Sequence, residues 1–379
     1  MNLLMIGSDP SVAQGHKSTH YHMLRHFARH WSRIDIICLP ARGAIPRQVH
    51  GNVFVHPSPW PKAFQPLHIV RRGRALMAER EYALVVTQDF GFFYTGMGAW
   101  WLVRSQPVPL VSEIHHVEGY PRAATFKEQV YRWLAMRYIP FINRRAAAFR
   151  AVNRIEVPEL LRKLGVPDEK ILVLPSIYLD YDVFNPGTEP ATRQFDLLYV
   201  GRLAPNKGLF TLLDGFHRLR RVRPDATLAI RGDGPLRRAL QQRIQALGLA
   251  EAITWIPRLE QIEQLAELYR AARALVCAST TEGGPRVTVE AMACGTPVIT
   301  TPVGVMRELV QDGVNGLVFH HWDAAELAEK AAALLADEAL QRRLGEAGRA
   351  SVQHFRAEDV IANYAAGYHD LIARWRAGR

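Results

Sequence analysis

The chain has 379 residues, of which 48% are hydrophobic, enough for two buried cores, and this composition excludes a disordered protein. Its three cysteines, Cys38, Cys277 and Cys294, lie far apart in apolar contexts, which excludes a disulfide framework and favours a reducing compartment. The formal net charge of +11 is uneven, because residues 1–150 hold 19 Lys+Arg against 8 Asp+Glu while residues 151–379 hold 28 of each. The basic first half favours an anionic membrane or an anionic acceptor, or serves solubility alone. Nucleic acid is not expected as a partner, since no recognition motif accompanies the charge.

The start of the chain and its apolar stretches predict where the protein works. Residues 1–7 lead directly into a strand-like segment, without the features of a signal peptide. The longest apolar stretch, residues 90–103, is too short and too interrupted by glycine to span a bilayer. We therefore expect a cytoplasmic protein, with peripheral contact at the inner face of the membrane as a further hypothesis.

The first half of the chain alternates short apolar runs with longer periodic segments. This alternation is typical of β-α-β units, so the sequence predicts a parallel sheet. In chain order, the predicted elements are strand 3–6, helix 19–31, and strands 34–39, 83–87 and 109–115.

A turn-rich stretch, residues 178–194, precedes a second series of the same kind. The second series comprises predicted strands at 196–200, 227–230, 253–256, 274–277 and 298–300, and predicted helices at 208–221, 236–247 and 262–272. We predict an α/β protein with a first Rossmann-like domain at 1–180, a linker at 181–194, a second Rossmann-like domain at 195–356, and a cleft between the two domains.

The stretch from Glu282 to Glu290 is the most informative motif. Two glycines and a proline follow Glu282, which favours a turn whose backbone can approach a ligand closely, so a helix should begin near Pro285 or Arg286. Free N–H groups at such a start attract phosphate oxygens. The two carboxylates can reach different parts of one elongated, hydroxyl-rich ligand, and a sugar nucleotide fits that description.

The spacing of the two acids resembles the donor site of the retaining glycosyltransferases of family 4, which have the GT-B fold and carry a Glu, seven residues and a second Glu. Residues 197–208 resemble the strand, basic turn and helix that hold the donor diphosphate in this family, and residues 231–235 and 312–318 match further motifs. The resemblance covers most of the chain and is strongest over 195–318. It implies two Rossmann-like domains with parallel sheets facing across a cleft, the first completed by the C-terminal helix 357–379.

The resemblance implies transfer of a sugar from a nucleoside diphosphate sugar to a hydroxyl acceptor, a glycan or a lipid-linked saccharide, with retention of configuration and without a required cofactor or metal. Arg202 and Lys207 would hold the diphosphate, because cations stabilise the charge that grows on the leaving group; the alternative is a solvated turn. Glu282 would accept hydrogen bonds from the sugar hydroxyls, or merely complement the helix dipole. Glu290 would accept them from the ribose, or lie on the helix surface.

Further residues are predicted to contact the donor. They are Gly15, Gly201, Gly232, Arg258, Gly283, Gly284, Val287 and Thr288. Two positions depart from the family. Gln14-Gly15 stands where relatives often carry two glycines, and Pro285-Arg286 stands where many relatives have an aromatic or aliphatic residue and Gly. Arg286 would add an anion contact or alter the sugar preference.

His115 ends the predicted strand 109–115 and aligns with the histidine that family members place at the reacting sugar. Its implied role is a hydrogen bond to the donor sugar and support of charge near the anomeric carbon. His116 is the alternative in register, and a structural histidine that caps the strand is the alternative in role. Metal binding by this pair is disfavoured, because no third ligand lies at helical spacing.

The aromatic and basic run at 131–145 predicts a helix that lies on an anionic membrane surface, or one that packs on the core with a solvated edge. Pro140 is expected to break or kink this helix.

Two other functions of the protein stay open. A GT-B nucleotide-sugar epimerase would use the same cleft without an acceptor, and a noncatalytic sugar-nucleotide-binding partner would release nothing.

Overall fold

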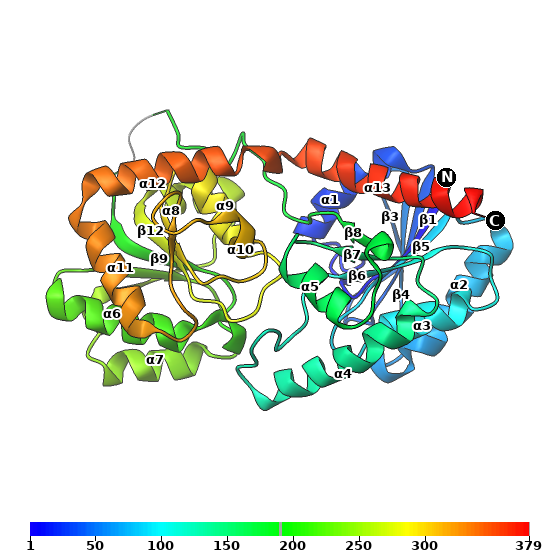
Figure 1. The fold of residues 1–379 in the computed structure, drawn as a ribbon, viewed down its shortest axis with the longest axis horizontal. Coiled ribbons are helices and arrows are strands. Elements are labelled where there is room, and N and C mark those ends of the chain that lie inside the picture. Colours follow the sequence, from blue (N-terminus) through cyan, green and yellow to red (C-terminus); the bar gives the residue numbers. More distant parts are fainter. Residues whose placement is uncertain (189–191, 379) are drawn as a thin grey trace. The chain divides into compact units, whose positions relative to one another are not determined.

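The computed structural model describes residues 1–188 and 192–378, so residues 189–191 of the predicted linker and residue 379 of the predicted C-terminal helix lie outside the described residues. The chain divides into two compact units (Figure 1). The first unit comprises Met1–Glu118, Gln129–Ser176 and Glu358–Arg379, and the second comprises Gly119–Glu128 and Ile177–Ala357. In this division the second unit begins at residue 177 and includes a short segment, 119–128, from the first half of the chain.

The first unit is built on an eight-stranded sheet with the order β3-β4-β2-β1-β5-β6-β7-β8. Its strands are β1 (Asn2–Ile6), β2 (Arg33–Cys38), β3 (Arg47–Val49), β4 (Val53–Pro57), β5 (Leu84–Gln88), β6 (Leu110–Ile114), β7 (Ala148–Ala151) and β8 (Ile171–Val173). All pairs are parallel except β3 with β4 at the edge. The predicted parallel sheet is therefore confirmed. Four of its strands, β3, β4, β7 and β8, were not predicted from the sequence, and β3 is the antiparallel edge strand.

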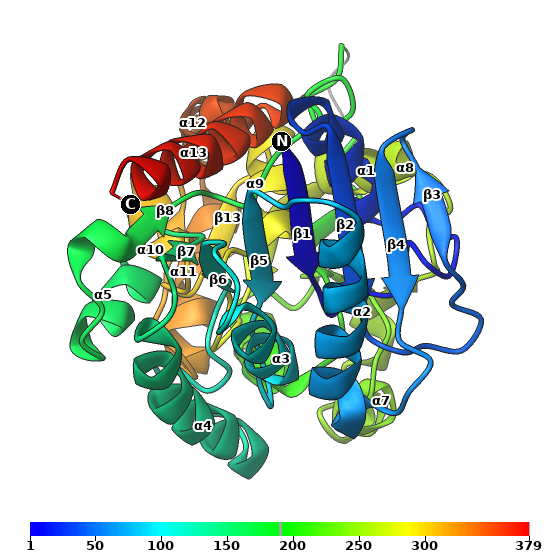
Figure 2. The same cartoon turned by 90° about the vertical axis from the view of Figure 1, so that its right-hand side faces the viewer.

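The strands of this sheet are apolar because helices cover both faces. Leu3, Leu4 and Ile6 of β1 are fully buried, as expected for a central parallel strand. Helices α2 and α3 pack against each other on one face (Figure 2). The helices whose residues belong mainly to this unit are α1 (Thr19–Phe27), α2 (Gln65–Glu79), α3 (Tyr94–Val103), α4 (Phe126–Asn143), α5 (Glu156–Lys163) and α13 (Ala357–Ala377), with 3-10 turns η1 (Ala28–His30), η2 (Lys62–Phe64) and η3 (Asp168–Lys170).

Two expectations for this unit are corrected by the helices. The predicted helix 19–31 is realised as α1 followed by η1. Helix α4 continues through Pro140, so the predicted break does not occur. Pro140 lies in the last turn of α4, where its missing N–H removes only one intrahelical hydrogen bond. Within 1–188 and 192–378, no helix combines the length and the apolar content needed to cross a membrane.

The second unit has a six-stranded, fully parallel sheet with the order β11-β10-β9-β12-β13-β14. Its strands are β9 (Phe195–Val200), β10 (Leu228–Arg231), β11 (Ile253–Ile256), β12 (Ala272–Cys277), β13 (Val298–Thr300) and β14 (Leu317–Val318). The chain leaves β9 towards β10 on one side and returns to β12 on the other. In such sheets, ligands bind outside the carboxyl ends of the strands at this switch point.

Helices cover both faces of the second sheet, and α6 packs against α11 on one of them (Figure 1). They are α6 (Leu209–Val222), α7 (Arg237–Ala246), α8 (Ile262–Arg270), α9 (Arg286–Ala293), α10 (Met306–Leu309), α11 (Ala324–Ala336) and α12 (Glu338–Ser351), with turns η4 (Pro205–Lys207), η5 (Ala250–Ala252) and η6 (Gln353–Phe355). The core is formed by buried aliphatic and aromatic residues of these helices and the strands, among them Leu212, Phe216 and Ile230.

Candidate functional site

Two loops meet at the switch point of the second sheet: the β9 loop, residues 201–208, and the β12 loop, residues 278–285. They are joined by hydrogen bonds. Asn206 Nδ2 donates to the Thr281 carbonyl oxygen at 3.0 Å, and the Thr280 amide donates to the Asn206 carbonyl oxygen at 2.8 Å. Each loop therefore holds the other in place.

Gly208 explains why the two loops approach so closely. Its φ is +62°, in the left-handed region, and a Cβ there would lie 1.9 Å from the Ala278 carbonyl oxygen. Only glycine satisfies both conditions. Gly232, after β10, is restricted in a similar way, because a Cβ there would lie 1.9 Å from the Gly201 carbonyl oxygen. The predicted glycines thus bring backbone segments together around the switch point.

The loops place Lys207 against Glu282. The Lys207 ammonium donates to Glu282 Oε1, which also accepts from Ser279 Oγ at 3.2 Å. The side chains of Lys207 and Glu282 are 20% and 15% exposed, so the pair is reachable from solvent. Arg202, earlier in the β9 loop, is exposed. The structure therefore brings two of the residues predicted for the reaction into contact and places the third on the same loop.

Helix α9 begins at Arg286 with Pro285 as its N-cap residue, as the sequence predicts. Before it, Gly283 is buried and its carbonyl oxygen accepts a hydrogen bond from the Val305 amide at 3.1 Å. Gly284 is partly exposed, and a Cβ there would lie 2.5 Å from Ile177 Cδ1. The turn after Glu282 is thus closely packed on its inner side.

Glu290 lies one turn into α9 and is only 5% exposed. Its two oxygens have separate donors: Arg286 Nε at 2.7 Å and the Tyr269 hydroxyl at 2.8 Å. Burial raises the pKa of Glu290, while Arg286 and Tyr269 oppose the rise. Arg286 also lies over the Tyr178 ring, 4.9 Å from its centroid. Arg286 therefore pairs with Glu290 in this structure, and Tyr269 is a partner that no sequence motif indicated.

Three further predicted residues lie in different surroundings. Val287 is partly exposed in the first turn of α9. Thr288 is fully buried, and among the described residues its hydroxyl has no hydrogen-bond partner. Arg258 is exposed after β11, at the edge of the sheet and two strands away from β9. The structure does not bring Thr288 to the surface of the loops, nor Arg258 to the switch point.

In the first unit, His115 follows the carboxyl end of β6, as predicted. Its side chain is 42% exposed, and its Nε2 lies 3.4 Å from Glu113 Oε2. Glu113 is fully buried and forms an ion pair with Arg150, 2.9 Å from Nη1 to Oε1. Burial alone would raise the pKa of Glu113, but Arg150, followed by the His115 and Tyr364 contacts, holds it well below its usual range. His115 thus stands in front of a buried, ionised carboxylate.

His20, which interacts with His115, and Asp9, which interacts with His20, were not identified from the sequence as site residues. His20, on α1, interacts electrostatically with Asp9, Glu113 and His115, and burial lowers its pKa while the two acids oppose the decrease. Asp9 lies in the loop after β1. In the sequence, the only sign of these two residues is that an acid and a histidine follow the first predicted strand.

Gly15, in the loop after β1, is exposed and has a φ of +87°.

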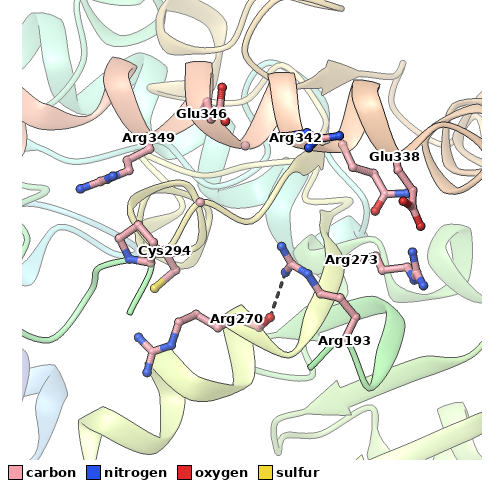
Figure 3. A pocket seen from close by; sticks show the side chains of 12 residues that line it. Arg193, Arg270, Arg273, Cys294, Glu338, Arg342, Glu346 and Arg349 are labelled. Atoms are coloured by element: carbon pink, nitrogen blue, oxygen red, sulfur yellow. Dashed lines mark hydrogen bonds between the residues drawn. The ribbon is translucent and has the colours of Figure 1, made fainter. Parts of the chain in front are cut away.

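A basic pocket of about 710 Å³ lies elsewhere in the second unit (Figure 3). It is lined by five arginines and two glutamates: Arg193, Arg270, Arg273, Arg342, Arg349, Glu338 and Glu346. Arg193 Nη1 donates to the Arg270 carbonyl oxygen at 2.9 Å, and Arg270 Nη1 donates to the Asn185 carbonyl oxygen at 2.9 Å. The pocket adjoins the amino end of β12, whereas the two loops adjoin the carboxyl ends of β9 and β12, so the pocket is separate from the candidate site.

Among residues 1–188 and 192–378, no group of three or more His, Cys, Asp or Glu is arranged to hold a metal ion.

Comparison with known sequences gives two family matches. Residues 180–351 match the model of the glycosyl transferases group 1, and residues 14–176 match that of the glycosyl transferase 4-like domain. The chain is 30% identical to the D-inositol 3-phosphate glycosyltransferase of Nocardia farcinica over 306 residues, 74% of this chain and 67% of the relative. It is 28% identical to the enzyme of that name from Segniliparus rotundus over 293 residues, 73% of this chain and 65% of the relative. With other relatives of that name, from Geodermatophilus obscurus and Arthrobacter, the chain spans 50% and 55% of their length.

Solved structures agree on the fold. Sucrose-phosphate synthase from Thermosynechococcus elongatus superposes with a TM-score of 0.82 at 22% identity, over 99% of this chain and 100% of that one. Anabaena Alr3699/HepE, solved in complex with UDP and glucose, superposes with a TM-score of 0.72 at 20% identity, over 98% and 100%. The predicted class, an α/β protein of two Rossmann-like domains with the GT-B fold, is confirmed.

Proposed function

Because the chain belongs to the group 1 glycosyltransferases, we propose that it transfers a sugar from a nucleoside diphosphate sugar to a hydroxyl acceptor with retention of configuration. The observation that carries the proposal is the Lys207–Glu282 pair, formed by two interlocked loops at the switch point of the second sheet. One loop offers a cation for a diphosphate and the other a carboxylate for sugar hydroxyls. In a sugar nucleotide, the diphosphate and the sugar hydroxyls lie next to each other.

The leaving diphosphate gains negative charge as the anomeric C–O bond breaks. Lys207 and Arg202 would stabilise that charge, Lys as a compact point charge and Arg as a planar fork. Lys207 is now held by Glu282, so donor binding would replace this contact with one to a phosphate oxygen. The exchange costs little, since both side chains are partly exposed and screened by water. With two cations in place, we propose that the reaction requires no metal ion.

Glu282, once released by Lys207, would accept hydrogen bonds from hydroxyls of the donor sugar. Glu290 would accept them from the ribose, with the side chain held by Arg286 and Tyr269. An ionised carboxylate has about four lone-pair sites, so a second hydrogen bond to each oxygen is available. His115 would accept a hydrogen bond from the donor sugar. Departure and attack on the same face, with the leaving phosphate taking the acceptor proton, would retain the configuration.

For the acceptor, we propose a saccharide or a lipid-linked saccharide. The relatives of Nocardia farcinica and Segniliparus rotundus are named for an inositol phosphate, and one from Bacillus anthracis is named as an N-acetyl-alpha-D-glucosaminyl L-malate synthase. Phosphate and malate, which these names mention, are anions. The excess of Lys and Arg in residues 1–150 favours an anionic acceptor here as well.

Exposed aromatic residues on the first unit support a lipid-linked acceptor. Phe92 and Trp133 are 54% and 58% exposed, and Phe92 packs edge-on against Tyr131. The Arg137 guanidinium lies 5.6 Å from the centre of the Trp133 ring. Aromatic rings with adjacent guanidinium groups suit the interface of an anionic membrane. We propose peripheral contact of these exposed aromatic and basic side chains with anionic lipid.

Liposome sedimentation tests the membrane contact. At low salt, the wild type should sediment with vesicles that contain phosphatidylglycerol and stay in solution with phosphatidylcholine alone. A Phe92→Ala/Trp133→Ala double variant should lose sedimentation, whereas Phe210→Ala, which removes a 42% exposed aromatic ring from the second unit, should retain it. Wild-type protein that ignores anionic vesicles would refute the contact.

A turnover assay tests the proposed transfer. Purified protein is incubated with UDP-, GDP- and ADP-sugars and a panel of glycan, lipid-linked and polyol phosphate acceptors, and released nucleotide and product are measured. Lys207→Ala should lose about 10²-fold or more in kcat/KM. The matched control is Lys330→Ala, since Lys330 pairs with Asp312 at 2.7 Å and is likewise 20% exposed, but lies outside the loops.

Each alternative has its own result in this assay. An isomerised free nucleotide sugar without released nucleotide would indicate an epimerase. Binding of a nucleotide sugar without any product would indicate a noncatalytic partner. Equal turnover by the wild type and Lys207→Ala would refute the assigned site.

A further inference from the structure

Glu113 is a buried carboxylate behind His115. It lies on β6 directly beside Arg150 of β7 in the parallel register. Arg150 donates from Nη1 to Glu113 Oε1 at 2.9 Å, while its Nε and Nη2 donate to the carbonyl oxygens of Leu174 and Pro175 at 2.9 and 3.0 Å. The guanidinium is therefore fixed on several sides and holds one particular oxygen of the carboxylate.

Helix α13 supplies two further donors to the same oxygen. Tyr364 and Tyr368 are four residues apart and share one face of the helix. Both hydroxyls donate to Glu113 Oε1, that of Tyr368 at 2.6 Å. Glu113 Oε2 instead faces His115 Nε2 at 3.4 Å. One oxygen thus takes three structural donors, and the other is left to the histidine.

This asymmetry determines where the neutral imidazole carries its proton. Glu113 is ionised beside Arg150, and a carboxylate can only accept hydrogen bonds. His115 Nε2 must therefore be the donor, which leaves Nδ1 as the unprotonated acceptor of the ring. The other ionisable groups of this cluster are Asp9 and His20, from the loop after β1 and from α1.

We infer that Glu113 is a positioning residue that holds His115 in the tautomer protonated at Nε2, and that Arg150, Tyr364 and Tyr368 orient the carboxylate for this task. The inference rests on the proposed function in one respect: Nδ1 then accepts a hydrogen bond from a hydroxyl of the donor sugar. A histidine of the opposite tautomer would present an N–H donor at that position, so the hydroxyl would have to accept the hydrogen bond and could no longer donate it to the ring.

Nitrogen-15 NMR of histidine-labelled protein, at a pH where the ring is neutral, tests the tautomer. The His115 signals are assigned by their absence in His115→Gln. The wild type should show Nε2 protonated and Nδ1 bare. A wild-type ring protonated at Nδ1 would overturn the inference, whatever the variants do.

Glu113→Gln should invert the tautomer. The three donors around Oε1 require the glutamine carbonyl oxygen at that position, so its NH₂ group faces His115 and can only donate. The imidazole proton should then move to Nδ1. Transfer should lose about 10²-fold in kcat, with a smaller change in KM for the donor. An unchanged tautomer in the folded variant would refute the positioning role, and an inverted tautomer with unchanged kcat would refute its importance for transfer.

Asp35→Asn is the matched control. Asp35 is another fully buried carboxylate of the first unit, held by Arg33, His56 and Tyr82. Its substitution disturbs a comparable network on β2 and should lower the melting temperature without changing the His115 tautomer. Equal loss of kcat in both variants with unchanged tautomers would indicate a merely structural role. The tautomer is read without substrate, so a wild type with the expected tautomer but no transfer would refute the proposed function alone.

Discussion

Two carboxylate–cation pairs near strand ends behave differently in this molecule. Glu282 and Lys207, in the second unit, are 15% and 20% exposed. Glu113 and Arg150, in the first unit, are 0% and 3% exposed, and both have several further hydrogen bonds. A partly exposed pair, which water still reaches, exchanges partners at less cost, whereas a fully buried pair cannot lose one member without leaving a desolvated charge. Burial therefore distinguishes the Lys207–Glu282 pair, which a ligand can reach, from the Glu113–Arg150 pair, which holds the scaffold.

The largest expected effect comes from breaking the buried pair. Arg150→Met leaves the Glu113 carboxylate buried without a cation and should lower the free energy of unfolding by about 3–5 kcal/mol. Lys207→Ala should cost less than about 1 kcal/mol, because its pair is partly solvated. Denaturant unfolding of both variants measures the contrast. Similar losses in the two would contradict the distinction drawn from burial.

Asp89 is a buried carboxylate whose pKa is raised, so its contribution to stability should depend on pH in the opposite direction to that of Glu113, whose pKa is lowered. Among the residues that the structure describes, hydroxyl groups donate to the Asp89 carboxylate, including those of Ser112 and Tyr138, and burial raises its pKa to about 6. A group whose pKa is raised in the folded state contributes stability that is present below its unfolded value, about 3.9, and is lost as the pH rises through 6.

The measurement compares the wild type with Asp89→Asn from about pH 4 to pH 7. The free energy of unfolding of the wild type, relative to the variant, should fall by up to about 3 kcal/mol over this range. Glu113, whose pKa is lowered, changes in the other direction, since its contribution is lost as the pH falls below its usual value. A pH-independent difference for Asp89 would show that the pKa of its carboxyl is not raised in the folded protein.

Glu282→Ala separates the two halves of the exposed pair. Transfer should fall about 10²-fold, because the sugar hydroxyls lose their acceptor. A nucleoside diphosphate without the sugar should bind at least as tightly as to the wild type, because Lys207 no longer has to leave Glu282. Calorimetric titration checks the affinity. Weaker binding of the diphosphate would show that Glu282 supports the loops rather than competes for Lys207.

Gly208→Ala gives a smaller effect on stability. The left-handed φ and the clash with the Ala278 carbonyl oxygen should together cost about 1–3 kcal/mol and separate the two loops. Gly248→Ala is the control, since Gly248 has a φ of +66° but nothing within 4 Å of a Cβ, so only the backbone strain applies. Thermal unfolding compares the two. Equal losses would mean that the approach of the loops does not depend on Gly208.

The sequence predicts some elements with their observed bounds and misses others, among them the short strands β3, β4, β7, β8 and β14. Strands β11 and β13 have the predicted bounds, and the helix at Arg286 begins where Pro285 indicates. Strand β3 was missed because its three residues, Arg47–Val49, include only one apolar side chain, and antiparallel pairing with β4 is its only link to the sheet. Such an edge strand forms because it pairs with its neighbour, and its own sequence carries no apolar pattern that would predict it.

The candidate site was only partly predictable for a similar reason. Lys207 and Glu282 were singled out because each belongs to a local motif that resembles the donor site of the family. Glu113 was not, because its partner Tyr368 is 255 positions away, and no periodicity within β6 indicates it. Tyr269, the partner of Glu290, is 21 positions away and on another helix. Contacts between distant segments become visible only once the strand order is known.

A thermal-shift titration of the wild type, Lys207→Ala and Lys330→Ala with UDP-, GDP- and ADP-sugars tests the central claim most directly, which is that the exposed pair at the switch point holds the donor. We predict that one nucleotide class raises the melting temperature of the wild type and of Lys330→Ala, and that Lys207→Ala loses this shift. An equal shift in all three proteins would place the donor elsewhere and contradict the account.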